Sequence, residues 1–452
     1  MPKKGPDFKK ITIALSLFVF LLIPLLKAED VNYDRYAPVW THGPLAEPSS
    51  HSGDALATFG KHFLVYPFEL VRWPIDKALI FAEDYHLYDK GDWVYQQLKN
   101  HGTTPKIRSL MGRGMAGEVD VEILQLTGVK EKLPDSSLKL SGMWSLDHII
   151  DYQVRLKQER IAGTGFFAGG ILGYQKKGEE HFYGIGPDTS LGDGTSYRLE
   201  KTTLALPIGY EIQDRIKIEG RFAYDNVNIT NGEDGGSGII DEIFVLGRKQ
   251  QIPGLGGDEI LRWGINFEHD NRNSKDLPTT GGYERLHFSF NKGIESSAGY
   301  FKYRAEAAHF MKVFSERQVM GVRGVFEHNN EVPGRDVPFF DMVRLGGFGA
   351  YPQLGDVQRG FRGDRFYDKS LMLLNLEYRW TVWNYRDWRM DSVLFWDEGQ
   401  VFGDFSNFQW NDFSSSYGMG LRIALQSDVL LDIELAMSHE GTQIYVKTRA
   451  PF

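Results

Sequence analysis

Apolar and polar residues alternate along most of the chain from about residue 104 onward. Clear runs of this alternation lie at 119–123, 301–307, 372–380 and 429–438. Successive side chains of a β-strand point to opposite faces, so each run predicts a strand with one apolar and one polar face. The region is therefore predicted to be all-β.

The breaks between these runs divide the region into strands. Long breaks lie near 176–195, 230–257, 329–370 and 401–415, and tight turns lie near 213, 316 and 426. An antiparallel barrel with both chain ends on one side needs an even number of strands. We count sixteen, with starts near residues 104, 116, 136, 148, 165, 196, 213, 257, 282, 297, 315, 371, 391, 415, 428 and 442.

A soluble β-sandwich also has alternating strands, so one strand cannot distinguish the two architectures. Sandwich strands are usually short and enclose a core about 10 Å thick. The strands predicted here reach about ten residues and have aromatic ends, which is typical of transmembrane barrels. We therefore predict a 16-stranded antiparallel transmembrane β-barrel over residues 104–452.

The amino terminus has the features of a secretory signal peptide. Four lysines, the last of them Lys10, precede an apolar run from Ile11 to Leu26. The run has about 16 residues, fewer than the roughly 20 of a spanning helix, which favours export over anchoring. We expect residues 1–28 to be removed by cleavage after Ala28, although Leu26 is larger than the usual small residue at its position.

Prolines interrupt regular structure in residues 29–103, and one helical pattern begins there at Pro74. There Ile75, Leu79, Ile80 and Tyr85 fall on one helical face. We expect a short periplasmic segment that packs under the barrel or plugs it.

Composition and net charge exclude or disfavour several classes of function. The chain has 50 glycines and 13% aromatic residues, which fits many strands and turns. It contains no cysteine, which excludes disulfides and cysteine-bound metals. Its net charge of −9 gives no reason to expect a nucleic-acid partner.

A glycine- and arginine-rich stretch in the long break at 329–370 is the strongest candidate site. It contains Arg359, Gly360 and Phe361, and Gly360 permits a turn that a Cβ atom would obstruct. A guanidinium inside a barrel needs an ionised partner. Asp397 and Gly399 share one face of a predicted strand, and Gly399 leaves room for a loop to approach. The alternative is that Arg359 lies in solvent.

These two motifs, in their order along the chain, resemble the BamA/TamA family of bacterial outer-membrane assembly and translocation barrels. The resemblance implies that the stretch is the sixth outer loop, between the eleventh and twelfth strands, and folds into the barrel. It implies that Arg359 contacts Asp397 on the barrel wall. Family members that assemble other proteins usually carry POTRA modules before the barrel, and we find no strand pattern for one in residues 29–103.

Further residues near these motifs have weaker assignments. Arg362, Asp364 and Arg365 are expected either to extend the ionic network inside the barrel or to lie in solvent. The last strand is expected to end at Phe452, a terminal aromatic residue that resembles the insertion signal of outer-membrane barrels. Pro451 departs from the usual pattern, because proline has no backbone donor.

Two other stretches resemble recurrent family segments. Residues 270–273 and 278–282 resemble a polar turn before the ninth strand. Residues 183–189, which read Tyr-Gly-Ile-Gly-Pro-Asp-Thr, carry no chemistry that we can assign.

Several apparent motifs point to no chemistry. Residues 112–117 match a dinucleotide-binding glycine pattern, but a strand follows where a helix is required. Residues 231–236 lack the regular oxygen spacing of calcium loops. No metal-binding histidine spacing or nucleophile motif is found, so no cofactor or metal is expected.

The sequence therefore predicts an outer-membrane barrel that inserts, assembles or translocates polypeptides. As the resemblance implies, its partners would be membrane lipid, unfolded outer-membrane or secreted polypeptides, and possible periplasmic accessory proteins. The main alternative is a passive channel or structural barrel. A weaker alternative is an enzyme that uses paired carboxylates inside the barrel, such as Asp432 and Glu434.

Overall fold

A computed structural model describes the chain over residues 103–109, 115–124, 136–145, 149–213, 215–232, 252–347, 356–385, 387–425, 428–448 and 450–452. The predicted signal peptide and the segment 29–103 lie outside these ranges, except for Thr103. Within the described ranges, no helix has the length and apolar character needed to cross a membrane.

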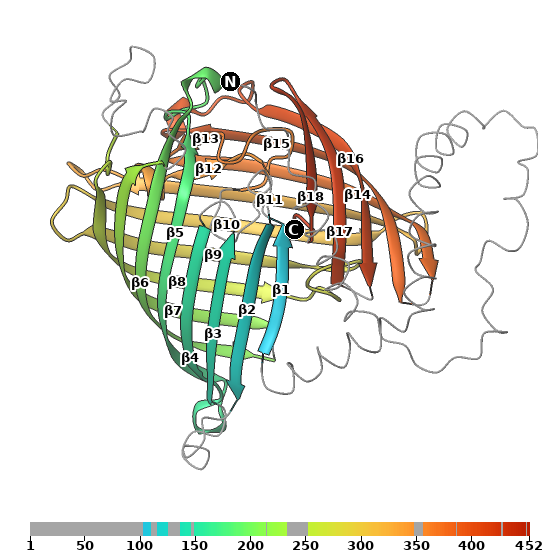
Figure 1. Cartoon of the computed structure of the whole chain (residues 1–452), viewed down its shortest axis with the longest axis horizontal. Coiled ribbons are helices and arrows are strands. Elements are labelled where there is room, and N and C mark those ends of the chain that lie inside the picture. The colour runs from blue at the N-terminus through green and yellow to red at the C-terminus, as the bar shows by residue number, and fades with distance from the viewer. Residues whose placement is uncertain are drawn as a thin grey trace, which may run out of the picture. The chain divides into compact units, whose positions relative to one another are not determined.

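Sixteen strands form one antiparallel sheet and pair in chain order (Figure 1). They are β1 (Thr103–Ser109), β2 (Met115–Leu124), β3 (Ser136–Ser145), β4 (Ile149–Gln158), β5 (Phe166–Phe182), β6 (Thr195–Ile212), β7 (Ile216–Asn231), β8 (Gly257–Asp270), β9 (Gly281–Gly293), β10 (Gly299–Lys312), β11 (Gln318–Glu331), β14 (Ser370–Tyr385), β15 (Trp388–Phe402), β16 (Ser414–Leu425), β17 (Asp428–Ser438) and β18 (Gly441–Lys447).

The predicted number of strands is confirmed, and each strand begins within a few residues of its predicted start. The largest difference is β5, which continues to Phe182 although a long loop was expected from residue 176. The register between β5 and β6 shifts between Lys177 and Glu180, so a bulge carries the strand through this polar stretch. Lys177 and Glu180 are both buried and form an ion pair at 3.7 Å.

Two short strands interrupt the connection between β11 and β14. They are β12 (Val343–Leu345) and β13 (Phe366–Asp368), which pair with each other in a separate two-stranded sheet. Leu345 lies opposite Phe366 in this pairing. The two strands bring the ends of the predicted Arg359 loop together.

Alternation gives the large sheet two different faces. On the outer face, apolar side chains are exposed, as for Val154 (41% exposed), Leu172 (53%) and Leu204 (49%), which follow one another across β4, β5 and β6. The inner face carries polar and charged side chains, and the β11–β14 connection packs against it. An exposed apolar face opposite a polar inner face is the arrangement of a transmembrane barrel.

Buried apolar residues of the β11–β14 connection pack against the inner face in two clusters. Phe339 of the connection packs with Phe182 and Tyr197 of the sheet at ring-centroid distances of 5.3 and 5.1 Å. Phe361 packs with Leu371 and Val401 in the second cluster. The connection is therefore held inside by hydrophobic packing as well as by charge.

The first and last strands of the sheet are its shortest. β1 and β18 have 7 residues each, whereas the strands between them have 10 to 18. Over the described residues, no pairing joins β1 to β18. Over the described residues, the β17–β18 register runs from the Ser438–Gly441 pair to the Asp432–Lys447 pair.

The chain end does not follow the predicted register. The last strand was expected to reach Phe452, but β18 ends at Lys447. The Phe452 ring stacks on Phe310 of β10 at 5.9 Å, beside a cluster of inner-face residues that includes Val319. Pro451 cannot donate a ladder hydrogen bond, which is consistent with the strand ending before it.

The two faces of β4 predict different responses to a new charge. Val154→Arg places a cation on the outer face near the middle of the strand and should lower the free energy of unfolding by about 2–4 kcal/mol in lipid vesicles. Gln153→Arg, one residue away, points into a polar cavity and should cost about 1 kcal/mol or less. Urea unfolding followed by tryptophan fluorescence measures both, and equal losses would contradict the assigned faces.

Candidate functional site

Arg359 is fully buried against β15. Its Nε and Nη2 atoms donate to the two carboxylate oxygens of Asp397, each at 2.7 Å, and its backbone N–H donates to Asp397 Oδ2 at 3.0 Å. Both side chains are 0% exposed. A bidentate pair of this kind is the geometry in which a guanidinium and a carboxylate interact most strongly.

Other groups around Arg359 also offset the cost of burying its charge. Burial alone would lower the pKa of Arg359, but the facing carboxylates of Asp397 and Glu434 outweigh burial and raise the pKa. The guanidinium carbon lies 3.6 Å from the centre of the Phe395 ring, which adds a cation–π contact. Arg359 therefore remains charged in the barrel interior.

The Arg359–Asp397 pair belongs to a larger buried network. Glu377 of β14 accepts from Arg359 at 3.2 Å and from Arg422 of β16 at 2.9 Å. Glu434 of β17 lies 3.4 Å from Arg359 and accepts from Lys447 of β18 at 2.6 Å. Carboxylates from three strands, β14, β15 and β17, therefore surround Arg359, and Arg422 of β16 and Lys447 of β18 balance their charge.

Asp432 and Glu434, the paired carboxylates of the enzyme alternative, belong to this network. Arg422 Nε donates to Asp432 at 3.0 Å, and Lys447 lies 3.5 Å from Asp432 as well as contacting Glu434. Both carboxylates are fully buried between cations. Their contacts are those of a structural ion network.

Gly360 and Phe361 attach the loop to the last two strands. The Tyr445 hydroxyl of β18 accepts from the Gly360 N–H at 2.9 Å and donates to the Phe361 carbonyl at 3.0 Å. The Ser438 hydroxyl donates to the Gly360 carbonyl at 2.7 Å. The three-residue motif therefore contacts β15 through its arginine and β18 through its backbone.

Gly360 of the loop and Gly399 of β15 both lie where a Cβ atom would come too close to neighbouring atoms. Gly360 has φ +88°, and a Cβ there would lie 3.0 Å from Ser416 Cβ. A Cβ on Gly399 would lie 2.7 Å from Leu345 Cδ2 and 2.9 Å from Gln358 Oε1. Gly399 thus lets the β11–β14 connection lie directly on β15.

A second ionic anchor of the loop was missed in the sequence. Asp356 forms a bidentate pair with Arg304 of β10, at 2.6 and 2.9 Å, and accepts from Arg323 of β11 at 2.9 Å. Glu306 and Glu327 contact the same arginines. Asp356 lies three residues before Arg359, so the loop contacts two parts of the sheet through opposite charges.

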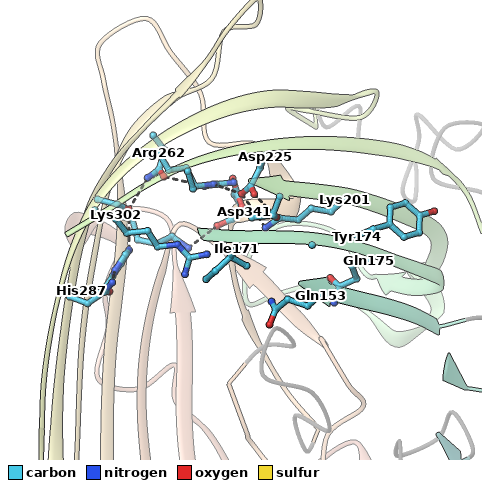
Figure 2. Close-up of a pocket in the computed structure, with 18 of the residues that line it drawn as sticks. Gln153, Ile171, Tyr174, Gln175, Lys201, Asp225, Arg262, His287, Lys302 and Asp341 are labelled. Carbon is cyan, nitrogen blue, oxygen red and sulfur yellow. Dashed lines mark hydrogen bonds and ion pairs between the residues drawn. The ribbon is translucent and has the colours of Figure 1, made fainter. Parts of the chain in front are cut away.

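A third anchor lies beside a polar cavity on the inner face. The cavity has a volume of about 310 Å³ and is lined by β4 to β10 and by Asp341 of the connection. In Figure 2, Arg262 of β8 lies between Asp225 of β7 and Asp341. Its guanidinium donates to them at 2.6 and 2.7 Å. Burial would raise the pKa of Asp341, but Arg262 and Lys302 outweigh burial and lower it.

The remaining loop residues from the sequence occupy different environments. Arg365 is buried and donates to Glu440 at 2.6 Å and to Thr189 Oγ1 at 2.7 Å. Asp364 is buried and accepts from Arg344 at 3.3 Å. Arg362 is exposed, and no ion pair joins it to another of the described residues.

The contacts of Arg365 give the stretch 183–189 a structural role. Thr189 accepts from Arg365, the guanidinium lies 5.1 Å from the Tyr183 ring centre, and Gly186 N donates to the Tyr367 carbonyl at 2.8 Å. This stretch therefore packs on the β11–β14 connection. Alternation alone does not indicate this contact, because the two segments are far apart in the chain.

The polar turn, the two glycine-rich stretches and the expected lack of a metal site remain to be compared with the structure. In the β8–β9 turn, Asp270 accepts two guanidinium bonds from Arg272, at 3.0 and 2.7 Å. The stretches 112–117 and 231–236 fall partly outside the described residues. In the described part of the chain, no group of three or more acidic or histidine side chains could hold a metal ion.

A family model for the Omp85 superfamily domain matches residues 150–436. The match spans more than half of the chain, so the chain belongs to the Omp85 superfamily. Such barrels are outer-membrane proteins of transport and assembly and are not enzymes.

Two solved structures are similar to the chain, and the first of them supports the barrel fold. BamA from Haemophilus ducreyi lacking POTRA domains 1–3 matches with a TM-score of 0.56 and 15% identity, over 77% of this chain and 69% of that chain. CdiB from Escherichia coli matches with a TM-score of 0.49 and 12% identity, over 77% of this chain and 62% of that chain. No curated protein sequence matches the chain.

The buried network predicts a large difference between two arginines of one loop. Arg359→Ala leaves Asp397 buried without its main partner and should lower the free energy of unfolding by about 3–5 kcal/mol. Arg362→Ala removes an exposed side chain and should change it by about 0.5 kcal/mol or less. Urea unfolding in vesicles compares the two, and similar effects would mean that Arg359 is not held as described.

The close approach at Gly399 makes a second prediction. Gly399→Val forces a branched side chain against Leu345 and Gln358 and should cost about 1–3 kcal/mol. Gly324→Val is the matched control on β11, because a Cβ there meets no atom within 4 Å. The same unfolding measurement applies. A tolerated Gly399→Val would show that the connection can move away from β15.

Proposed function

We propose that this Omp85 barrel inserts or translocates polypeptides at the bacterial outer membrane, with the Arg359 loop controlling the end of its sheet. The observation that carries the proposal is the attachment of one loop motif to both β15 and β18. Arg359 binds Asp397, while Gly360 and Phe361 bind Tyr445. A change in the loop is therefore transmitted to the last strand.

The ends of the sheet support this role. β1 and β18 are short, no described pairing joins them, and β1 contains Pro105, which cannot donate a ladder bond. Unpaired backbone groups at such edges can pair with an incoming strand, which is recognition by β-augmentation.

The proposed working cycle needs no cofactor. An unfolded polypeptide would pair with the free edge, and burial of its apolar residues in lipid would drive release into the membrane. The ionic anchors at Asp356 and Arg359 would keep the connection in the barrel while the edge strands separate. Membrane lipid and an unfolded outer-membrane or secreted polypeptide are the proposed partners.

The two segments before the barrel would serve export and substrate delivery. Residues 1–28 would direct export and be cleaved, and residues 29–103 would meet substrates or periplasmic accessory proteins on the periplasmic side. A passive channel or structural barrel is the competing function. It predicts ion conductance without any effect on the folding of other proteins.

The test follows the folding of an unfolded outer-membrane protein in liposomes that contain the purified barrel. The native barrel should accelerate substrate folding over empty liposomes. Arg359→Ala should abolish the acceleration, and Arg362→Ala should retain it. Arg359→Lys keeps the charge but loses the bidentate geometry and should show an intermediate rate.

Each variant must first be shown to be folded by its resistance to protease in the same vesicles. No acceleration by the native barrel, together with conductance across planar bilayers, would favour the passive channel. If added periplasmic extract restored acceleration, an accessory partner would be required. Equal acceleration by Arg359→Ala and the native barrel would refute the role assigned to the loop.

A further inference from the structure

The connection between β15 and β16 concentrates aromatic side chains. Phe408 lies against Phe402 and Trp410 at ring-centroid distances of 5.3 and 5.0 Å, and Trp410 stacks on Phe413 at 6.2 Å. The short helix η8 (Phe405–Asn407) starts this connection with a capping box between Asp404 and Asn407. We call residues 405–413 the aromatic loop.

The aromatic loop folds back over the outer face of the sheet. On β11, Arg323 and Glu327 point to the inner face, so Phe326 and His328 point outward. The Phe405 ring lies 5.9 Å from Phe326 and 4.8 Å from His328. The loop therefore covers outward-facing residues and does not enter the barrel.

Hydrogen bonds fix the position at which the chain leaves β15 and enters the aromatic loop. His328 Nδ1 and the Ser370 hydroxyl are 2.7 Å apart, and the hydroxyl donates to the Gly403 carbonyl at 3.2 Å. On β15, Phe402 faces the same way, because the adjacent Val401 belongs to the inner cluster. Polar contacts and ring packing thus position the loop on three strands, β11, β14 and β15.

Two rings of the packed loop remain uncovered. Phe405 is 61% exposed and Trp410 is 77% exposed, although their neighbours in the loop pack together. On β15, further from the loop, Trp396 and Leu394 are also exposed on the outer face. The aromatic loop therefore continues the exposed apolar surface of the barrel wall towards the end of the strands.

We propose that the aromatic loop is a membrane-interface anchor, which inserts Phe405 and Trp410 into the lipid leaflet at that end of the strands. Three observations select lipid as the occupant. The loop lies on the lipid-facing side of the wall, its exposed rings continue the apolar surface, and Asp404 and Asp412 provide polar groups beside them. Aromatic rings with polar neighbours favour the boundary between headgroups and acyl chains.

The anchor has a structural consequence for the candidate site. Its loop joins β15, which carries Asp397, to β16, which carries Arg422. Insertion of the loop would fix these two strands relative to the membrane surface. The inference depends on the barrel lying in a membrane and does not depend on the proposed insertase activity.

The absence of cysteine from the sequence allows a direct test. Single cysteines replace Trp410, Leu204 at mid-strand on the outer face, or Asp188, an exposed residue of the β5–β6 connection. Each full-length variant is labelled with an environment-sensitive fluorophore in vesicles of phosphatidylcholine that carry nitroxide at the headgroup or deep in the chain. Iodide is the aqueous quencher.

The Trp410→Cys label should be quenched by the shallow nitroxide about twofold or more over the Asp188→Cys label. The Leu204→Cys label should respond to the deep nitroxide instead. A label at 410 that behaves like the label at 188 would overturn the proposal. Protection from both iodide and nitroxide would also overturn it, because a protein partner or second copy would then cover the loop.

A second position keeps the test decisive if Trp410→Cys does not fold. Phe405→Cys reports on the other exposed ring of the same loop, and protease resistance establishes that each variant is folded. The same shallow quenching is expected there. Quenching by iodide alone at position 405 would refute the anchor.

Discussion

A positive charge held entirely away from water is the constraint on which this structure depends. Arg359 has no exposed surface, so its desolvation must be offset by Asp397, Glu377, Glu434 and the Phe395 ring. Asp397 and Phe395 lie on β15, Glu377 lies on β14 and Glu434 lies on β17. The inward course of the β11–β14 connection therefore requires β14, β15 and β17 to stand in one particular arrangement.

The anchors of the connection alternate in sign along the chain. Their order is Asp341, Arg344, Asp356, Arg359, Asp364 and Arg365, and each contacts an opposite charge in the described structure. If the connection moved so that each of these residues took the place of its neighbour in the series, it would meet a partner of the same charge. Alternation thus selects one path of the connection through the barrel, a use of buried charge that concerns specificity more than stability.

Much of the wall could be predicted from the sequence, because a period of two is visible in each strand without its neighbours. The inward side of β14 and β17 could be predicted because Glu377, Asp432 and Glu434 alternate with apolar residues. The contact between Arg359 and Asp397 was expected from a buried-charge argument joined to a family resemblance. Asp356 was missed, although Arg304 and Arg323 lie on the polar faces of two predicted strands and needed an acidic partner.

Other features depend on contacts between distant segments, which no local pattern reveals. The stretch 183–189 acquires its role only when Arg365 reaches Thr189, 176 residues away. The aromatic loop looked like an ordinary break, because its rings gain meaning from Phe326 and His328 on another strand. Phe452 was assigned to the last strand by periodicity, yet its ring packs on Phe310, which lies on β10.

The separation of the Arg359 partners along the chain also orders assembly in time. Glu377, Asp397 and Glu434 follow Arg359 by 18, 38 and 75 residues. Until β17 reaches its place, the guanidinium lacks one of its carboxylates, and closing so many long-range contacts is slow. The loop can therefore complete its docking only after β14, β15 and β17 stand together, so its seating reports that the C-terminal part of the sheet has assembled.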